Sequence, residues 1–187
     1  MNKNNVFSVR SMTFTAIMAA IICVAAPFSI PLPALVPISL ATFAVYLAGG
    51  LLGAKRGTLA VVVYILIGAV GLPVFWGFSG GLAKLMGVTG GYILGYVPCA
   101  LLTGIFADMS AKKRWLLPLG MILGTAACYL LGTVWFIIAT GSTLSAAIAA
   151  CVIPFLAGDA IKIAAATGIC IPIKSRISSM LGETEKI

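Results

Sequence analysis

The feature that most restricts this chain is the scarcity of ionisable side chains within its long apolar runs. Of 187 residues, 61% are hydrophobic and 9% are charged, whereas a soluble domain is about 25% charged. A helix that crosses a bilayer needs ~20 mostly apolar residues. The composition therefore predicts an all-α membrane protein, folded as a single transmembrane domain over residues 1–187, without room for a separate soluble domain.

Apolar runs that end at proline, glycine or basic residues divide the chain into six predicted membrane spans. Their approximate bounds are residues 12–26, 38–54, 57–74, 90–109, 115–139 and 153–173. We expect the alanine-rich segment 144–152 to form a short helix at the membrane interface. The long connection between the third and fourth spans is rich in glycine and aromatic residues, so we expect it to fold back over the protein.

The positions of the basic residues predict the orientation of the chain. Lysine and arginine gather before the first span and after the second, fourth and sixth, whereas the alternate connections carry only Lys84. Because positively charged connections remain in the cytoplasm, both termini are expected to be cytoplasmic, as an even number of spans requires. The formal charge of +8 is thus attributed to topology, and no nucleic-acid partner is predicted.

Several classes of function are disfavoured by residues that the sequence lacks. It contains no histidine and only four acidic residues, so the usual general bases and metal ligands are scarce. It has no GxxxxGK[ST] motif for ATP, and no pair of interrupted spans typical of a self-sufficient transporter. We therefore predict that the chain is not an enzyme and has no catalytic residue, metal or cofactor. We expect instead a protein that captures a ligand and depends on another component for the energy of transport. The five cysteines show no CxxC spacing and are interpreted as small core residues.

Two charged residues lie inside a predicted span and are the leading candidates for a binding site. Asp159 and Lys162 are three positions apart in LAGDAIKIAA, so they share one helix face. A charge inside the membrane costs roughly 2.5–3.5 kcal/mol on insertion scales and indicates a functional site by default. The alternative is a neutralising pair kept for packing. Counted from Ile153 at ~1.5 Å per residue, the pair lies about 9 and about 14 Å below the outer surface.

Other side chains at a similar depth predict a pocket open to the outside, with apolar walls and a few polar anchors. These candidates are Tyr92, Tyr96, Trp135, Ser39, Thr42 and Tyr46. Gly90 and Gly91 open the fourth span, where unpaired N–H groups can face a ligand acceptor. Lys84, in the outer connection, is a candidate partner for an acidic ligand group.

Small residues on the first span predict a contact with another helix. Ala16 and Ala20 are spaced by four positions on one face, and small side chains at this spacing let helices approach closely in lipid. Internal packing is the alternative, because alanine is common in membrane spans.

Two segments together resemble the signatures of a known family. The outer connection GLPVFWGFSGGLAKLMGVTGGYILGY and the later segment PFLAGDAIKIA are similar to those of the BioY family, the biotin-specific substrate-capture (S) components of bacterial energy-coupling factor (ECF) transporters. The resemblance covers essentially the whole chain. One departure is Val88, where the family pattern has proline before Thr-Gly-Gly-Tyr.

The resemblance implies an ECF S-component fold in the bacterial plasma membrane and high-affinity capture of biotin from outside. It implies that Asp159 and Lys162 contact the biotin head, with Tyr92 and the Gly90-Gly91 turn lining the site. It also implies that the face carrying Ala16 and Ala20 docks on a transmembrane coupling subunit, which is joined to two ATPase subunits. Two alternatives stay open: an S component for another vitamin, and a stand-alone proton-coupled carrier in which Asp159 titrates.

Overall fold

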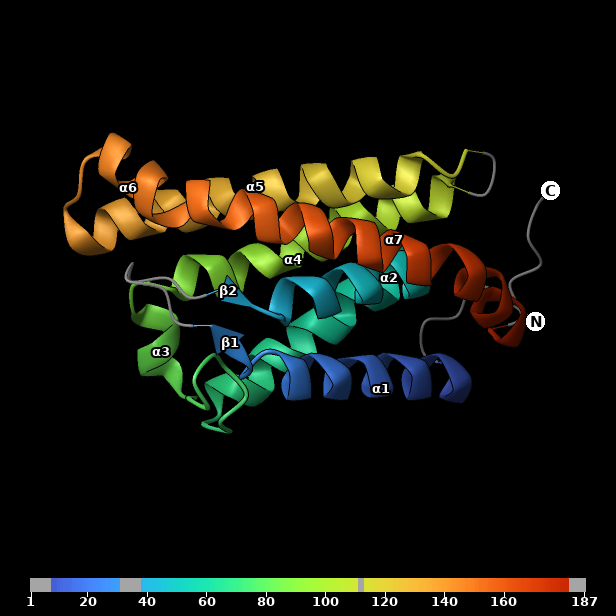
Figure 1. Cartoon of the computed structure of the whole chain (residues 1–187). Coiled ribbons are helices and arrows are strands. Elements are labelled where there is room, and N and C mark those ends of the chain that lie inside the picture. Colours follow the sequence, from blue (N-terminus) through green and yellow to red (C-terminus); the bar gives the residue numbers. More distant parts are fainter. Residues whose placement is uncertain (1–7, 31–37, 111–112, 182–187) are drawn as a thin grey trace.

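The structure is a computed structural model that describes residues 8–30, 38–110 and 113–181 (Figure 1). The all-helical prediction is confirmed, apart from a two-residue strand pair that follows the first helix. The helices are α1 (Val9–Ala25), α2 (Ala41–Ala69), α3 (Leu82–Met86), α4 (Gly90–Met109), α5 (Leu116–Thr140), α6 (Leu144–Cys151) and α7 (Ile153–Met180). The antiparallel strands are β1 (Ser29–Ile30) and β2 (Ile38–Ser39).

Four helical stretches within the described residues are long and apolar enough to cross a membrane. They are α2, α4, α5, and α6 with α7 taken together as Leu144–Met180, while α1 is a shorter apolar helix. The expected short helix before the last span is confirmed as α6. The second and third predicted spans correspond to the two parts of α2. This helix ends at Ala69, whereas the third span was predicted to end near residue 74. The count of six spans remains a prediction.

Helix α2 is interrupted at Gly53, where the backbone is not helical. Gly53 has φ 76° and ψ −176°, a conformation that glycine adopts at little cost because it has no Cβ. Gly57 and Ala48 are nine positions apart, which would separate them by about 13 Å in a straight helix. Instead, a Cβ placed on Gly57 would lie 2.5 Å from the carbonyl oxygen of Ala48. The chain therefore folds back on itself at Gly53.

This reversal lies two residues before the predicted boundary at Lys55 and Arg56. The side chain of Arg56 is buried within α2, and its Nε donates a hydrogen bond to Ser11 Oγ of α1. The carboxylate of Asp108, at the end of α4, accepts a 3.0 Å hydrogen bond from the Ala54 amide. Asp108 thus satisfies one of the unpaired N–H groups at the start of the second half of α2.

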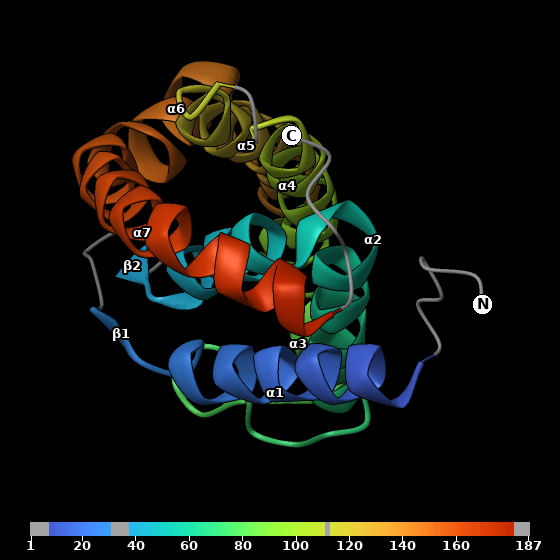
Figure 2. The same cartoon turned by 90° about the vertical axis from the view of Figure 1, so that its right-hand side faces the viewer.

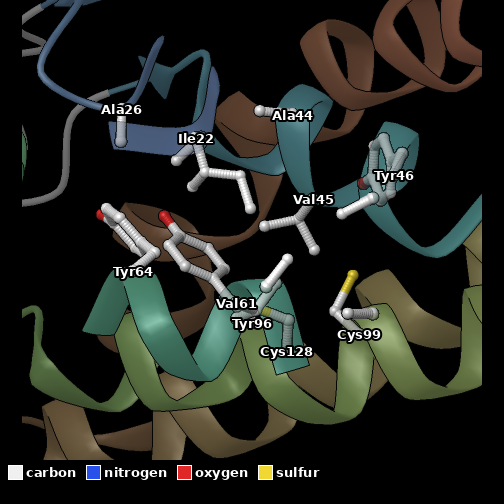
Figure 3. Packing of buried hydrophobic residues seen from close by; sticks show 14 of the residues in the cluster. Ile22, Ala26, Ala44, Val45, Tyr46, Val61, Tyr64, Tyr96, Cys99 and Cys128 are labelled. Carbon is white, nitrogen blue, oxygen red and sulfur yellow. The ribbon is translucent and has the colours of Figure 1, made fainter. Parts of the chain in front are cut away.

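The core forms where α1, the two halves of α2, α4 and α5 meet (Figure 3). Ile22 of α1 and Tyr96 of α4 are both buried in this core. Glycine allows the helices to approach closely: a Cβ on Gly49 would lie 2.7 Å from the Ala100 carbonyl oxygen. Such close approach is the main source of helix association in lipid, where apolar burial gives little driving force.

The start of α1 and the end of α7 lie at one end of the bundle, opposite α3 and α6 (Figure 1). Figure 2 shows α1 along one side and α5 and α6 on the other, while α7 runs from the α6 side toward α1. Arg10 Nη1 donates a 2.9 Å hydrogen bond to the Met180 carbonyl, so the start of α1 and the end of α7 are adjacent. Helices α3 and α6 lie at the opposite end (Figure 1). The cytoplasmic location of the termini remains a prediction.

Candidate ligand-binding site

A cavity lies between α2, α4, α5, α6 and α7. Both residues of the intramembrane charged pair line it, and most of its other walls are aromatic rings and thiols. The lining residues are Ser39, Thr42, Tyr92, Tyr96, Cys128, Tyr129, Cys151, Phe155, Asp159 and Lys162.

Helix α7 places Asp159 and Lys162 on the cavity wall. Pro154 lies in the first turn of this helix, a position that proline favours because no N–H is needed there. The Lys162 ammonium lies 3.0 Å from Asp159 Oδ1, and the two side chains are 12% and 5% exposed. Lys162 also donates to the Ser39 carbonyl at 2.8 Å and to Thr42 Oγ1 at 3.0 Å. An ammonium has three N–H groups, so all three are in use.

The Asp159 carboxylate is held from three directions. Its Oδ1 accepts from Lys162 and from Thr42 Oγ1, the latter at 3.3 Å. Its Oδ2 accepts a 2.5 Å hydrogen bond from the Tyr129 hydroxyl of α5. Because a carboxylate offers about four lone-pair positions, one position on Oδ2 remains available to a ligand donor. The buried charge is thus paired and hydrogen-bonded, as burial requires.

The remaining walls are largely apolar. Tyr92 has only long hydroxyl contacts, 3.4 Å to Thr133 Oγ1 and 3.5 Å to the Cys151 carbonyl. The Cys128 thiol donates to the Tyr92 carbonyl at 3.6 Å, and the Phe155 ring completes the lining. Such a site suits a compact ligand with one hydrogen-bonding head and an apolar body.

The structure brings some predicted site residues together and leaves others beside the cavity. Asp159, Lys162 and Tyr92 line it, as do three further predicted candidates, Ser39, Thr42 and Tyr96. Tyr46 lies outside the lining, where its hydroxyl is 2.5 Å from Thr125 Oγ1.

Four predicted residues instead organise the neighbouring outer connection. The Lys84 ammonium lies 3.9 Å from the centroid of the Trp76 ring, a cation–π contact, and partial burial lowers the pKa of Lys84. The indole N–H of Trp135 donates to the Gly87 carbonyl at 3.0 Å. A Cβ on Gly91 would collide with the Trp135 side chain, and one on Gly90 with the Leu85 carbonyl. Both glycines are therefore needed for close packing.

The outer connection folds back over the bundle, as expected. The Phe75 ring is fully buried and contacts Tyr64 of α2 edge-to-face at 5.6 Å between centroids. Phe78 makes a similar contact with Phe28 at 5.5 Å, and the Gly77 amide donates to the Pro27 carbonyl at 3.1 Å. These contacts join the connection to the end of α1.

Four lining residues were not predicted from the sequence: Cys128, Tyr129, Cys151 and Phe155. Two of them belong to the cysteines that were interpreted as core residues, and Cys128 and Cys151 are indeed buried as well as lining the cavity. Tyr129 could have been noticed, because a tyrosine hydroxyl within an apolar span needs a hydrogen-bond partner.

The fold is that of a multi-pass membrane protein with a cavity between its helices. Among residues 8–30, 38–110 and 113–181, no cluster of three or more His, Cys, Asp or Glu side chains could hold a metal ion.

Comparison with known proteins identifies the family. A sequence model of the BioY family matches residues 1–179. The biotin transporter BioY of Thermotoga maritima is 39% identical over 165 residues, which cover 88% of this chain and 96% of that protein. A probable biotin transporter BioY of Pyrococcus horikoshii is 36% identical, covering 84% of this chain and 91% of that protein. The chain belongs to the BioY family, which is a family of membrane transporters rather than enzymes.

A solved structure supports the same assignment. The chain is similar to the crystal structure of the S-component for biotin from an ECF-type ABC transporter, with a TM-score of 0.84 and 27% sequence identity. The match covers 92% of this chain and 94% of that one. The fold is therefore that of an ECF S-component over nearly its whole length.

Proposed function

We propose that this chain binds biotin at the outer side of the cell membrane and delivers it inward together with an ATP-driven ECF module. The observation that carries the proposal is the 39% identity to a biotin transporter across 96% of that protein's length. The cavity chemistry supports it. The ureido ring of biotin offers two N–H donors and one acceptor, while its ring sulfur and valeryl chain are apolar, as are most of the cavity walls.

In this proposal the biotin head binds beside Asp159, Lys162 and Tyr92, which line one cavity. Trp135, Gly90 and Gly91 support the adjacent wall through the packing of the α3–α4 connection against α5. Lys84 is assigned to the biotin carboxylate near the mouth, where it would exchange its contact with Trp76 for the ligand.

The same proposal assigns the partner surface to α1. Ala16 and Ala20 are exposed, whereas the neighbouring Ala19 is buried. Exposed small residues leave room for a second helix, which we assign to the transmembrane coupling subunit joined to two ATPase subunits. We further propose six spans, with the two halves of α2 counted separately, and both termini in the cytoplasm.

Equilibrium binding of labelled biotin to the detergent-purified chain tests the ligand. We expect saturable binding that excess unlabelled biotin displaces and that thiamine and riboflavin do not. No saturable binding, or equal displacement by the other vitamins, contradicts the assignment.

Reconstitution into vesicles tests the need for a partner. We expect the purified chain to bind biotin but to import it only when the coupling subunit, both ATPases and ATP are present. Uptake by the chain alone, driven by a pH gradient, would support a proton-coupled carrier instead.

Bulky substitutions test the docking surface. Ala16→Trp and Ala20→Trp should leave biotin binding unchanged and reduce copurification with the coupling subunit, because they fill the space that a partner helix would occupy. Ala165→Trp is the matched control, since Ala165 is an exposed alanine on α7. Equal copurification of all three variants would contradict a docking role for α1.

A further inference from the structure

One wall of the cavity depends on how closely α4 and α5 approach each other. Tyr92 of α4 lines the cavity, and its ring lies directly against the backbone of α5 at Gly132. A Cβ placed on Gly132 would lie 2.3 Å from Cε1 and 2.5 Å from Cζ of this ring. Carbon atoms in contact prefer a separation of about 3.5–4.0 Å. The ring therefore occupies space that the side chain of any other residue at position 132 would need.

The hydroxyl contacts of Tyr92 are too long to fix the ring by themselves. The hydroxyl lies 3.4 Å from Thr133 Oγ1 and 3.5 Å from the Cys151 carbonyl oxygen, whereas O–H···O hydrogen bonds are usually about 2.5–3.0 Å long. Packing against Gly132 is therefore the closer constraint on the ring.

The backbone of α5 does not itself require glycine at position 132. Gly132 is buried inside the helix, and its φ is not positive. Glycine in a helix interior is less favourable than alanine by about 1 kcal/mol. The close approach of the Tyr92 ring is thus the physical reason for a glycine at this point.

The same interface holds a second lining side chain in the reciprocal way. Gly95 of α4 faces Cys128 of α5, and a Cβ on Gly95 would lie 3.0 Å from the Cys128 Sγ. Cys128 lines the cavity as Tyr92 does. Each helix therefore places a glycine opposite a lining side chain of the other, so the two glycines determine how far this wall extends into the cavity.

We propose that Gly132 is a positioning residue that determines ligand specificity: by holding the Tyr92 ring back against α5, it leaves room in the cavity for a head of two fused rings. The inference rests on the proposed function, because the ureido ring of biotin is fused to a sulfur-containing ring. Alanine at position 132 would displace the Tyr92 ring by roughly 1 Å. Because α5 blocks one side of the ring, the displacement takes space from the cavity.

The test compares biotin with desthiobiotin, which keeps the ureido ring and the acidic chain but lacks the sulfur and hence the second ring. In Gly132→Ala we expect biotin affinity, measured by equilibrium binding to the detergent-purified chain, to fall by roughly 10- to 100-fold, because small size differences in an apolar pocket have effects of this order. Desthiobiotin is smaller and should lose less, so the preference for biotin should fall by about 10-fold. An unchanged ratio of the two affinities overturns the inference.

Gly124→Ala is the matched control. Gly124 also packs α5 against α4, where an added Cβ would lie 2.7 Å from the Cys99 carbonyl oxygen, but neither of these residues lines the cavity. We expect this variant to change the ratio by less than about twofold, as for independent sites. An equal change in both variants would mean that separation of the helices, and not the Tyr92 ring, alters the cavity, which overturns the inference.

A double-variant cycle with Tyr92→Leu tests the contact itself and is measured by thermal unfolding without ligand. Leucine removes the ring, so the fall in thermal midpoint caused by Gly132→Ala should be at least roughly halved in this background, whereas the fall caused by Gly124→Ala should stay the same. If Gly132→Ala alone is not monodisperse, adding Tyr92→Leu should restore a monodisperse protein. Additive falls, or no recovery, overturn the inference. Absence of biotin binding by the wild-type chain overturns the proposed function, while this cycle still tests whether Gly132 positions the ring.

Discussion

Among the residues that the structure describes, two aspartate–lysine ion pairs have different surroundings. Asp159 and Lys162 lie within α7, 3.0 Å apart, with side chains 5% and 12% exposed, and both line the cavity. Asp108 and Lys174 join the end of α4 to α7 at 3.6 Å, and the Asp108 side chain is 54% exposed. The first pair is surrounded by the helices, while the second lies beside the reversal at Gly53.

The difference shows that burial and neighbouring space, rather than the ion pair itself, indicate function. A buried pair is costly, and replacing it by apolar residues is often neutral or stabilising, so its presence beside a cavity favours a role in binding. An exposed pair contributes about 0–1 kcal/mol. The more specific contribution of Asp108 is its hydrogen bond to the Ala54 amide. Four substitutions, from the largest expected effect to the smallest, test this distinction.

Asp159→Asn should have the largest effect. It removes the only negative charge described at the cavity wall and leaves the Lys162 ammonium buried without its counter-ion. Breaking one partner of a buried pair typically costs about 3–5 kcal/mol. We expect biotin affinity, measured by equilibrium binding, to fall by more than roughly 100-fold. Asp108→Asn is the matched control, and unchanged binding in both variants would assign a packing role to the buried pair.

Lys162→Met should have a smaller effect on the same measurement. Methionine keeps most of the apolar stem, while Asp159 retains its hydrogen bonds from Thr42 and Tyr129. We expect biotin affinity to fall by roughly 10- to 100-fold, because the carboxylate loses its strongest orienting contact. Lys174→Met is the control at the exposed pair. A larger loss for Lys162→Met than for Asp159→Asn would mean that the ammonium, and not the carboxylate, meets the ligand.

Local patterns were sufficient to predict most helices and to place Asp159 and Lys162 together at the cavity wall. Apolar runs bounded by breakers correspond closely to α1, α4, α5 and α7, and the spacing of Asp159 and Lys162 required a shared helix face. The predicted boundary in α2 lay two residues after the observed reversal. Basic residues indicate where a segment leaves the membrane, whereas the turn itself needs a residue that tolerates positive φ. Gly53 meets that need, and the charged side chain of Arg56 is buried.

Contacts between distant helices could not be predicted in the same way. Tyr129 is thirty positions from Asp159, so their hydrogen bond depends on how α5 packs against α7 and not on any local spacing. The contact between Lys84 and the Trp76 ring could not be predicted either, because it depends on how the outer connection folds. A sequence read alone identifies residues that need partners more readily than it identifies those partners.

Gly53→Ala should affect stability more than binding. Its φ of 76° is unfavourable for alanine, and the added Cβ would collide with the Asp108 carboxylate. We expect a loss of about 1–3 kcal/mol in the free energy of unfolding, measured by thermal unfolding in detergent. Gly141→Ala is the matched control, because Gly141 has φ 68° with no atom near the added Cβ, so only the backbone cost of about 1–2 kcal/mol remains. Equal losses would show that Asp108 moves aside freely.

Asp108→Asn should have the smallest effect. The amide oxygen of asparagine can still accept the hydrogen bond from Ala54, so the variant loses chiefly the attraction to Lys174. We expect a decrease of less than about 1 kcal/mol in the free energy of unfolding, with unchanged biotin affinity. Because salt screens exposed charges over ~3 Å at 1 M, thermal midpoints of the variant and the wild type should converge as salt is raised. Asp108→Ala should lose about 1 kcal/mol more at every salt concentration, since it also removes the acceptor for Ala54. If asparagine and alanine behave alike, the ion pair and not the hydrogen bond stabilises the reversal at Gly53.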